Sequence, residues 1–383
     1  MNSKERLLTT LEHKEPDRVP LDLGGWVTTI SVKTYQRLLS YLKIDRDAQV
    51  FDWLRQNVSP EEDVLQRLGV DTRYVHLGKP HFWNFKPNST PDGMWVRDEW
   101  GCGFLMPESS LYYNLMDSPL RNATIDDLDN YSWPDPNDKG FLDGVEAQAK
   151  ALAEDGQFGV VGNFAWESWF ERAWKLRGMD TFFMDMVINK EFVHALLDKT
   201  LSIHMTLLDN VLEVCGKHLD VIIQGGDLGG QKNTLMSLNA YREYIKPRQE
   251  KSIRLIKEKT KAKVFWHSCG AISNLIDDFI EVGIDILNPV QVSSTGMDIL
   301  ELKKKYGENI VFWGGIDSQN ILPYGSTQDV EAAVKGTFKS AGANGGLVMC
   351  AVHNIQADVP EENVLALYDA ARKFGQYSIS STQ

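Results

Sequence analysis

Short apolar runs recur along this chain, and a stretch with helical periodicity follows most of them. Most runs are bounded by Gly, Asp or Asn, which is typical of strands buried in a parallel sheet. The runs occupy residues 18–23, 72–77, 158–162, 221–225, 263–267, 285–288, 310–313 and 346–350. Helical spacing is found over residues 31–42, 60–68, 169–179, 190–214, 240–259, 273–282, 298–306 and 328–340.

Eight alternations of strand and helix predict an α/β fold, a parallel (β/α)8 TIM barrel, because each helical crossover returns the chain to the same end of the sheet. A doubly wound open sheet is the structural alternative. Residues 78–155 are far longer than an ordinary crossover. Residues 94–101 within them alternate like a hairpin strand. We therefore expect one domain over residues 1–383, with an insertion at about 78–155 that covers the barrel mouth.

Composition narrows the class of protein. Hydrophobic residues make up 43% of the chain and charged residues 24%, as in a soluble globular protein with a large core. The net charge of −13 argues against nucleic acid or an anionic membrane as a partner. Residues 1–7 read as a helix capped by Asn2 and Glu5 rather than as a signal peptide. Four cysteines without a Cys-x-x-Cys pair fit a reducing cytoplasm.

The most informative chemistry stands at the ends of two predicted strands. His267 and Cys269 are two positions apart at the end of one run, so both side chains can reach one ion. Cys350 ends the last run. Active sites of such barrels lie at the carboxyl ends of the strands. One imidazole and two thiolates would make a zinc site with an open fourth position. The alternative is a core histidine beside a buried thiol, with Cys350 as a barrel-filling residue.

Other polar residues follow strand ends. Glu167 and Asp227 are candidates for a fourth ligand or a general acid, although a solvated carboxylate or a helix cap explains either equally well. His353 is a candidate acid or substrate donor, or else a histidine that fastens its loop. Asn288 and Gln291 follow the sixth strand, and we expect them to contact substrate.

Tryptophan is abundant, with eleven residues in the chain. Several lie near predicted strand ends or in the insertion, where they would wall a pocket for a flat apolar substrate. These are Trp26, Trp83, Trp95, Trp100, Trp166, Trp169, Trp266 and Trp313. Of them, we assign Trp26, Trp166, Trp266 and Trp313 to the substrate site. Fingerprints of dinucleotide binding, P-loops and serine hydrolases are missing.

Four segments resemble the uroporphyrinogen decarboxylase superfamily. They are Glu-Pro-Asp-Arg-Val-Pro at 15–20, His-Ser-Cys-Gly at 267–270, Val-Phe-Trp-Gly-Gly-Ile-Asp at 311–317 and His-Asn-Ile-Gln at 353–356. The resemblance spans almost the whole chain. The decarboxylases proper carry Arg-Gln-Ala-Gly-Arg near the N-terminus to grip substrate carboxylates, whereas residues 21–26 here read Leu-Asp-Leu-Gly-Gly-Trp. The chain looks more like the corrinoid-dependent methyltransferase branch.

That resemblance implies zinc on His267, Cys269 and Cys350, and methyl transfer between a small molecule and the cobalt of a separate corrinoid (cobalamin) protein. The Asp-x-His-x-x-Gly signature of cobalamin-carrying domains is absent. The aromatic-rich insertion favours the O-demethylase type, acting on a methoxylated aromatic. The alternatives are a methylthiol or methylamine methyltransferase, a metal-free decarboxylase-like lyase, and a non-catalytic barrel that binds a corrinoid or tetrapyrrole protein. A homodimer is compatible with the sequence.

Overall fold

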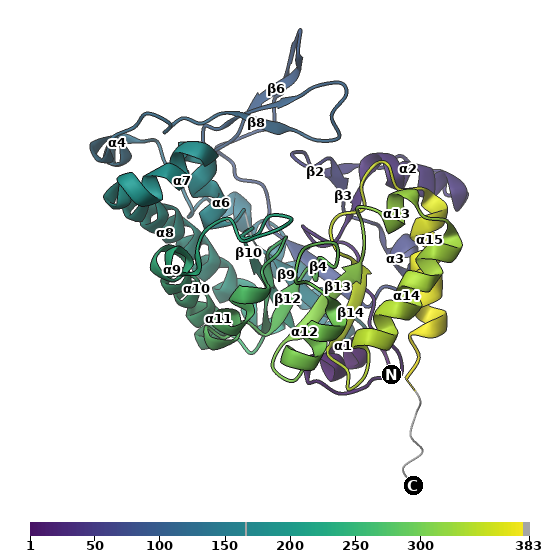
Figure 1. The fold of residues 1–383 in the computed structure, drawn as a ribbon. Coiled ribbons are helices and arrows are strands. Elements are labelled where there is room, and N and C mark those ends of the chain that lie inside the picture. Colours follow the sequence, from purple (N-terminus) through teal and green to yellow (C-terminus); the bar gives the residue numbers. More distant parts are fainter. Residues whose placement is uncertain (165–166, 378–383) are drawn as a thin grey trace.

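A curled sheet of parallel strands forms the centre of the computed structural model, which describes residues 1–164 and 167–377 (Figure 1). Within those residues the sheet has seven strands in the order β14-β13-β12-β11-β10-β9-β4. They are β4 (Thr72–His76), β9 (Gly159–Asn163), β10 (Val221–Gly225), β11 (Lys263–His267), β12 (Ile286–Asn288), β13 (Val311–Ile316) and β14 (Leu347–Ala351). Each corresponds to a predicted apolar run.

The eighth predicted strand, residues 18–23, is reduced to a single bridge. Leu21 pairs in parallel with Met349 of β14, and its carbonyl accepts a hydrogen bond of 2.8 Å from the backbone N–H of Asp71. The segment thus joins β14 to the start of β4 and closes the predicted barrel. It does not extend further because Pro20 has no N–H to donate and Gly24 turns the chain at φ +126°.

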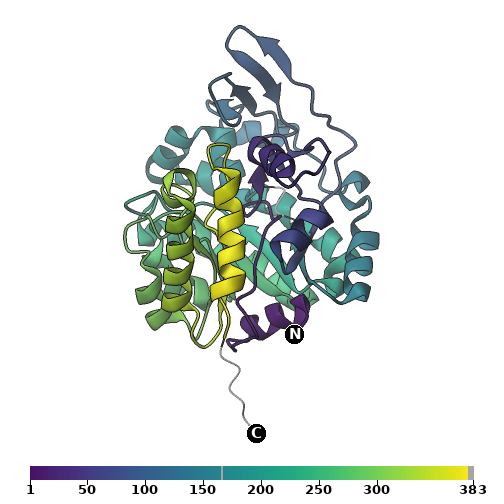
Figure 2. The same cartoon turned by 90° about the vertical axis from the view of Figure 1, so that its right-hand side faces the viewer.

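Helices cover the outside of the barrel, and α14 and α15 lie side by side on it (Figure 2). The α-helices are α1 (Ser3–Leu11), α2 (Val32–Tyr41), α3 (Glu62–Leu68), α4 (Ile125–Asn130), α5 (Val145–Asp155), α6 (Trp169–Arg177), α7 (Met179–Ile188), α8 (Lys190–Cys215), α9 (Leu238–Ala240), α10 (Lys246–Lys259), α11 (Ile276–Glu281), α12 (Ile299–Tyr306), α13 (Ile321–Tyr324), α14 (Thr327–Ala341) and α15 (Glu361–Phe374). Shorter 3₁₀ or π segments are η1 (Lys139–Leu142), η2 (Gly216–His218), η3 (Tyr241–Ile245) and η4 (Ser273–Leu275). None of the described helices meets the length and hydropathy needed to cross a bilayer.

Alternation along the strands divides the core into two layers. Phe265 of β11 belongs to the cluster inside the barrel, together with Trp313, Val348 and Cys350. Trp266, the next residue of β11, belongs to the larger cluster between sheet and helices and packs against Phe279. His267 therefore returns to the inner face, at the end of the barrel where the strands finish.

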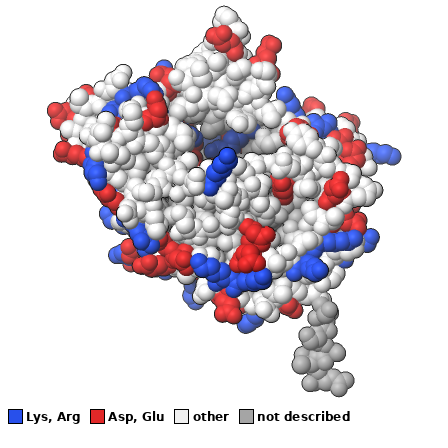
Figure 3. Space-filling model, viewed as in Figure 1, with Lys and Arg blue, Asp and Glu red and all other residues white. Residues whose placement is uncertain are grey.

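The insertion carries an antiparallel sheet of its own: β5 (Asn88–Thr90), β6 (Gly93–Arg97), β7 (Gly103–Met106) and β8 (Asn114–Asp117). This sheet stands at the opposite end of the molecule from the N-terminus (Figure 1), above a hollow that contains basic side chains (Figure 3). A second small sheet, which the sequence pattern did not predict, joins β1 (Ile30–Ser31), β3 (Asn57–Val58) and β2 (Val50–Asp52). It brings residues 50–58 to the same hollow.

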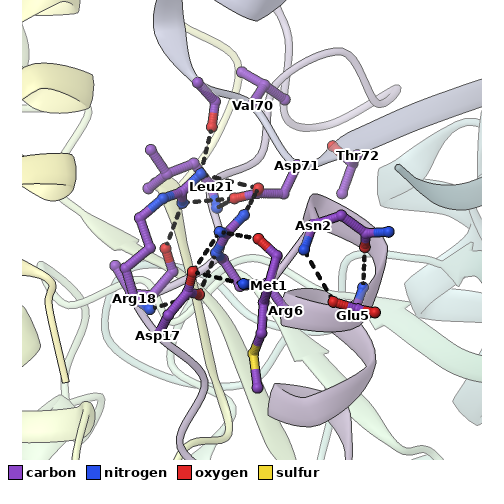
Figure 4. Close-up of polar contacts among 12 residues, drawn as sticks. Met1, Asn2, Glu5, Arg6, Asp17, Arg18, Leu21, Val70, Asp71 and Thr72 are labelled. Carbon is purple, nitrogen blue, oxygen red and sulfur yellow. Dashed lines mark hydrogen bonds and ion pairs between the residues drawn. The ribbon is translucent and has the colours of Figure 1, made fainter. Parts of the chain in front are cut away.

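The N-terminal helix fastens the opposite end of the barrel. Its predicted capping box is present, with Glu5 N–H donating to Asn2 Oδ1 at 2.8 Å and Asn2 N–H donating to Glu5 Oε2 at 3.0 Å. Arg6 then donates to both Asp17 and Asp71 at 2.7 Å (Figure 4). We call Arg6, Asp17, Arg18 and Asp71 the base cluster, because they lie at the end of the barrel opposite the mouth.

The base cluster predicts an acid-sensitive contribution to stability. Burial opposes ionisation of Asp17, but the hydrogen bond and charge of Arg6 outweigh it and lower its pKa to about 2. The unfolded pKa is about 3.9. The folded pKa is depressed, so this stability is present above the unfolded value and lost as the pH falls from about 4 toward 2. Urea unfolding between pH 6 and pH 2 should show a smaller loss for Asp17→Asn than for wild type. The exposed Asp45→Asn is the control, and equal slopes for all three proteins would contradict the prediction.

Candidate active site

His267 is oriented by a chain of hydrogen bonds across two strands. Asn288, opposite it on β12, donates its side-chain N–H to the carbonyl of Trp313 at 2.9 Å, which turns its Oδ1 toward His267 Nδ1 at 2.6 Å. Nδ1 must therefore carry the proton, and Nε2 presents a lone pair to the barrel mouth. Burial lowers the pKa of His267 to about 4, so the ring is neutral. A neutral imidazole held in this way is suited to bind a cation.

Cys269 lies beside that lone pair. Its Sγ is 3.5 Å from His267 Nε2, and its backbone N–H donates to Asp227 Oδ1 at 2.8 Å. The following residue, Gly270, has φ +92°, and a Cβ there would lie 2.4 Å from the backbone of Gly229. Only glycine allows this approach, so the loops after β10 and β11 interlock and hold Cys269 in place.

The third member of the group is His353. One ligand atom from each of His267, Cys269 and His353 can be chosen so that all three lie within 4.8 Å of one another. The two imidazole rings have centroids 5.6 Å apart. Burial, His267 and Arg55 lower the pKa of His353 to about 3, so it too is neutral. The sequence predicts His353 as an acid or substrate donor, and the structure brings its ring beside His267 and Cys269.

Cys350 does not lie beside His267 and Cys269, where the sequence predicts it. It is 1% exposed and packs inside the barrel with Val348 and Trp313. Burial, with the nearby Asp22 carboxylate, raises the pKa of its thiol well above the usual value. This is the environment of a barrel-filling residue, the alternative that the sequence had left open.

Two carboxyl groups flank the group of ligands. Asp227 Oδ1 is 3.5 Å from His267 Nε2, and the backbone N–H of Asp227 donates to Glu171 Oε1 at 2.9 Å. Burial raises the pKa of both carboxyl groups, and for Glu171 the charge of Asp227 adds to the effect. Burial, with Asp227, also raises the pKa of the Cys269 thiol. A cation bound beside the neutral imidazoles would stabilise the ionised forms of these two carboxyl groups and of the thiol.

Glu167 is an ion-paired carboxylate. It contacts Lys175, lies 2.6 Å from Arg172 Nη2 and 3.6 Å from Arg55 Nη2. Burial opposes its ionisation, but these three cations lower its pKa to about 2. A group so readily ionised is a poor general acid, which was one of the two roles that the sequence predicted for Glu167.

The cavity at the barrel mouth has two lobes, and Leu54, Arg55 and Tyr113 border both. The metal lobe, of about 700 Å³, is lined by Cys269, Gln291 and His353 and by residues 111–115 of the insertion. The aromatic lobe, of about 800 Å³, is lined by rings together with His76, Asn163, Glu167 and Arg172. Its rings are Trp26, Phe51, Trp53, Trp83, Phe85, Tyr113 and Phe141.

The predicted substrate residues divide between wall and core. Trp26 lines the aromatic lobe and lies 5.9 Å from the His267 ring. Trp266, 1% exposed, faces the helices because it alternates with His267 along β11. Trp313 fills the barrel interior, where its Nε1 donates to Asp22 at 2.8 Å. Neither borders the cavity, and Trp166 lies outside the described residues.

The two predicted amides support other groups. Asn288 is fully buried and holds His267, so it does not line the cavity. Gln291 borders the metal lobe, but its Oε1 accepts from Gly270 N–H at 2.8 Å and its Nε2 donates to Gln231. Asn288 thus contacts His267, and Gln291 contacts the loop that follows Cys269.

Several residues of the site carried no signal in the sequence. Arg55 and Trp53 come from a segment without strand or helix periodicity, and Glu171 resembles an ordinary polar position of helix α6. His76 is an exception, because it lies at the end of a predicted strand, as do the candidate residues named from the sequence. Its place at a strand end was the one signal that could have identified it.

Comparisons with known proteins identify the family and the fold of the chain. The family model described as Uroporphyrinogen decarboxylase (URO-D) matches residues 94–374. A uroporphyrinogen decarboxylase from Microcystis aeruginosa is 24% identical over 267 residues, covering 68% of this chain and 71% of that protein. The methylcobamide:CoM methyltransferase MtbA of Methanosarcina mazei is 24% identical over 283 residues, covering 72% and 75%. A solved methyltransferase from Methanosarcina mazei shares the fold, with a TM-score of 0.64 at 18% identity over 98% of this chain and 99% of that one.

Proposed function

The chain belongs to the uroporphyrinogen decarboxylase family, and we propose that it is a zinc-dependent methyltransferase that passes a methyl group from a methoxylated aromatic to a separate corrinoid protein. The observation that carries the proposal is the group formed by His267, Cys269 and His353 beside a cavity with an aromatic wall. The similarity of the chain to a relative named as a methylcobamide:CoM methyltransferase supports the same reaction class.

A decarboxylase-like lyase is the second candidate, because another relative carries that name. Tetrapyrrole substrates bring several carboxylates and need cations to receive them. Three of the basic residues that border the cavity are already paired: Arg55 with Asp52 at 3.0 Å, Arg172 with Asp98, and Lys175 with Glu167. Lys79 also borders the aromatic lobe. Where the decarboxylases carry arginines, Asp22 is buried in the barrel. These features favour the methyltransferase.

We propose that His267, Cys269 and His353 hold the zinc ion. Two imidazoles and a thiolate are the donors of zinc rather than of magnesium or calcium, and three protein ligands leave an open position. When bound, zinc would supply a Lewis acid to an ether oxygen or a binding site for a thiolate. The distance of 3.5 Å from Asp227 Oδ1 to His267 Nε2 supports Asp227 as a fourth ligand or an orienting group.

The remaining residues have roles in binding and orientation. The rings of the aromatic lobe receive the substrate ring, and Arg55 lies over Trp26 at 5.0 Å where the lobes meet. Transfer breaks the methyl–oxygen bond and leaves negative charge on the oxygen. Asp227, 3.5 Å from His267 Nε2, and Glu171, which accepts from the backbone N–H of Asp227, would supply a proton to that oxygen. The insertion covers the mouth and limits the access of water.

Assays with a panel of methyl donors test this proposal. The panel contains 2-methoxyphenol, methanol, a methylamine and a methylated thiol. We expect methyl transfer to cob(I)alamin, followed by absorbance, from 2-methoxyphenol in preference to methanol. Two ring contacts of about 1 kcal/mol each correspond to a preference of roughly 30-fold. Without a corrinoid acceptor the isolated chain should not turn over.

The Cys269→Ala variant is the control for uncatalysed transfer. Preference for a methylated thiol or a methylamine would refute the aromatic donor and leave zinc-dependent transfer standing. Decarboxylation of a tetrapyrrole by the chain alone would refute the reaction class.

A further inference from the structure

His76 and Asn163 form a polar pair inside the aromatic lobe. They end the adjacent strands β4 and β9 and stand opposite each other in the register. Asn163 Nδ2 lies 2.9 Å from His76 Nδ1, so the amide and the ring are hydrogen-bonded to each other. Both residues line the lobe.

Each member of the pair retains one polar atom without a partner. His76 Nε2 and Asn163 Oδ1 are buried and make no hydrogen bond with any residue that the structure describes. Asn163 is only 8% exposed. With Asn163 donating to Nδ1, His76 Nε2 is an N–H donor and Asn163 Oδ1 is an acceptor. Buried polar groups are normally hydrogen-bonded, so a pair left open on a cavity wall indicates a ligand.

The surroundings restrict that ligand to an aromatic ring. Phe51 packs on His76 with ring centroids 4.4 Å apart, and it is itself 45% exposed. Trp53 and Phe85 stack nearby at 5.0 Å. A bound ring would take the place of the exposed Phe51 side chain over His76.

The free donor and acceptor together select a hydroxyl group. A phenolic O–H can donate to Asn163 and accept from His76, whereas an ether or carboxylate oxygen can only accept. Burial lowers the pKa of His76 to about 4, so the ring stays neutral and keeps one donor and one acceptor nitrogen.

We propose that His76 and Asn163 form a hydroxyl-recognition subsite, and that the preferred methyl donor is a methoxylated phenol. The proposal rests on the proposed function and names the substrate class of the same cavity. The two residues act on specificity rather than on the methyl transfer itself.

Binding to the full chain without corrinoid tests the subsite. Quenching of tryptophan fluorescence would give dissociation constants for 2-methoxyphenol and 1,2-dimethoxybenzene, which differ in one hydroxyl. We expect the phenol to bind wild type roughly tenfold more tightly, the scale of one buried hydrogen bond. His76→Leu and Asn163→Leu should reduce that ratio to near one, and His76→Gln should restore part of it.

His81→Leu is the matched control, because His81 is exposed on the insertion and does not line the lobe. Far-UV circular dichroism establishes that each variant is folded, and the two leucine variants test the pair independently. Equal binding of both ligands to wild type, or an unchanged ratio in a folded His76→Leu or Asn163→Leu protein, would overturn the subsite. A hydroxyl preference in binding without methyl transfer would overturn the proposed function alone, and transfer without that preference would overturn the subsite alone.

Discussion

His353→Ala should bind zinc at least roughly 100-fold more weakly than wild type, because it removes one of three ligands. The structure places His353, rather than Cys350, with His267 and Cys269. Activity should fall by a similar factor while the barrel stays folded, since His353 is half-buried and borders the cavity at the mouth. Zinc per chain, measured by mass spectrometry after dialysis, and the zinc dissociation constant check this result.

Cys350→Ala separates the two possible ligand sets. The structure predicts that this variant keeps about one zinc per chain, with a modest loss of stability from the small cavity in the barrel. Zinc lost from Cys350→Ala and retained by His353→Ala would restore the set that the family resemblance implied. Cys269→Ala should lose zinc under either assignment and serves as the positive control.

Asp71→Ala should lower the free energy of unfolding by about 3–5 kcal/mol, the range for breaking a buried ion pair. Asp71 is fully buried and accepts from Arg6 at 2.7 Å, from Arg18 at 2.7 and 3.0 Å and from the backbone N–H of Leu21 at 2.8 Å. Its removal leaves two guanidinium groups without their shared acceptor in the base cluster. Urea unfolding at pH 7 measures the change.

Asp369→Ala provides the comparison, since Asp369 pairs with Arg67 and Arg372 on the surface with its side chain 47% exposed. An exposed pair of this kind contributes about 0–1 kcal/mol. Equal effects of the two substitutions would show that the base cluster does not hold the barrel together.

The barrel was predictable because its signal is local. A short apolar run bounded by Gly, Asp or Asn identifies a buried strand wherever it stands, and seven of the runs are strands in the structure. Position at a strand end likewise predicted that His267 and Cys269 lie together, and their side chains are 3.5 Å apart in the structure. The run at 18–23 forms only a bridge because Pro20 interrupts the hydrogen bonding. The apolar composition of the run does not indicate this interruption.

Side-chain direction was less predictable where the strand ends. The alternation of β14 stops at Ala351, so the loop that follows decides where His353 points. Cys350 still obeys the alternation and therefore faces the packed interior. Trp266 could have been assigned to the outer layer from the same rule, because it is adjacent to the inward-facing His267. The position of Arg55 at the cavity depends on tertiary contacts of an irregular segment, so no periodicity in the sequence could reveal it.

The ligand group and part of the aromatic wall have different origins in the chain. The ligand group stands on barrel loops that glycine contacts lock together, whereas Trp83, Phe85 and Tyr113 come from the insertion. The proposed metal ligands and these three rings of the proposed substrate site can therefore change separately. Grafting another insertion between β4 and β9 is a route to enzymes that accept new methyl donors while keeping the same reaction centre.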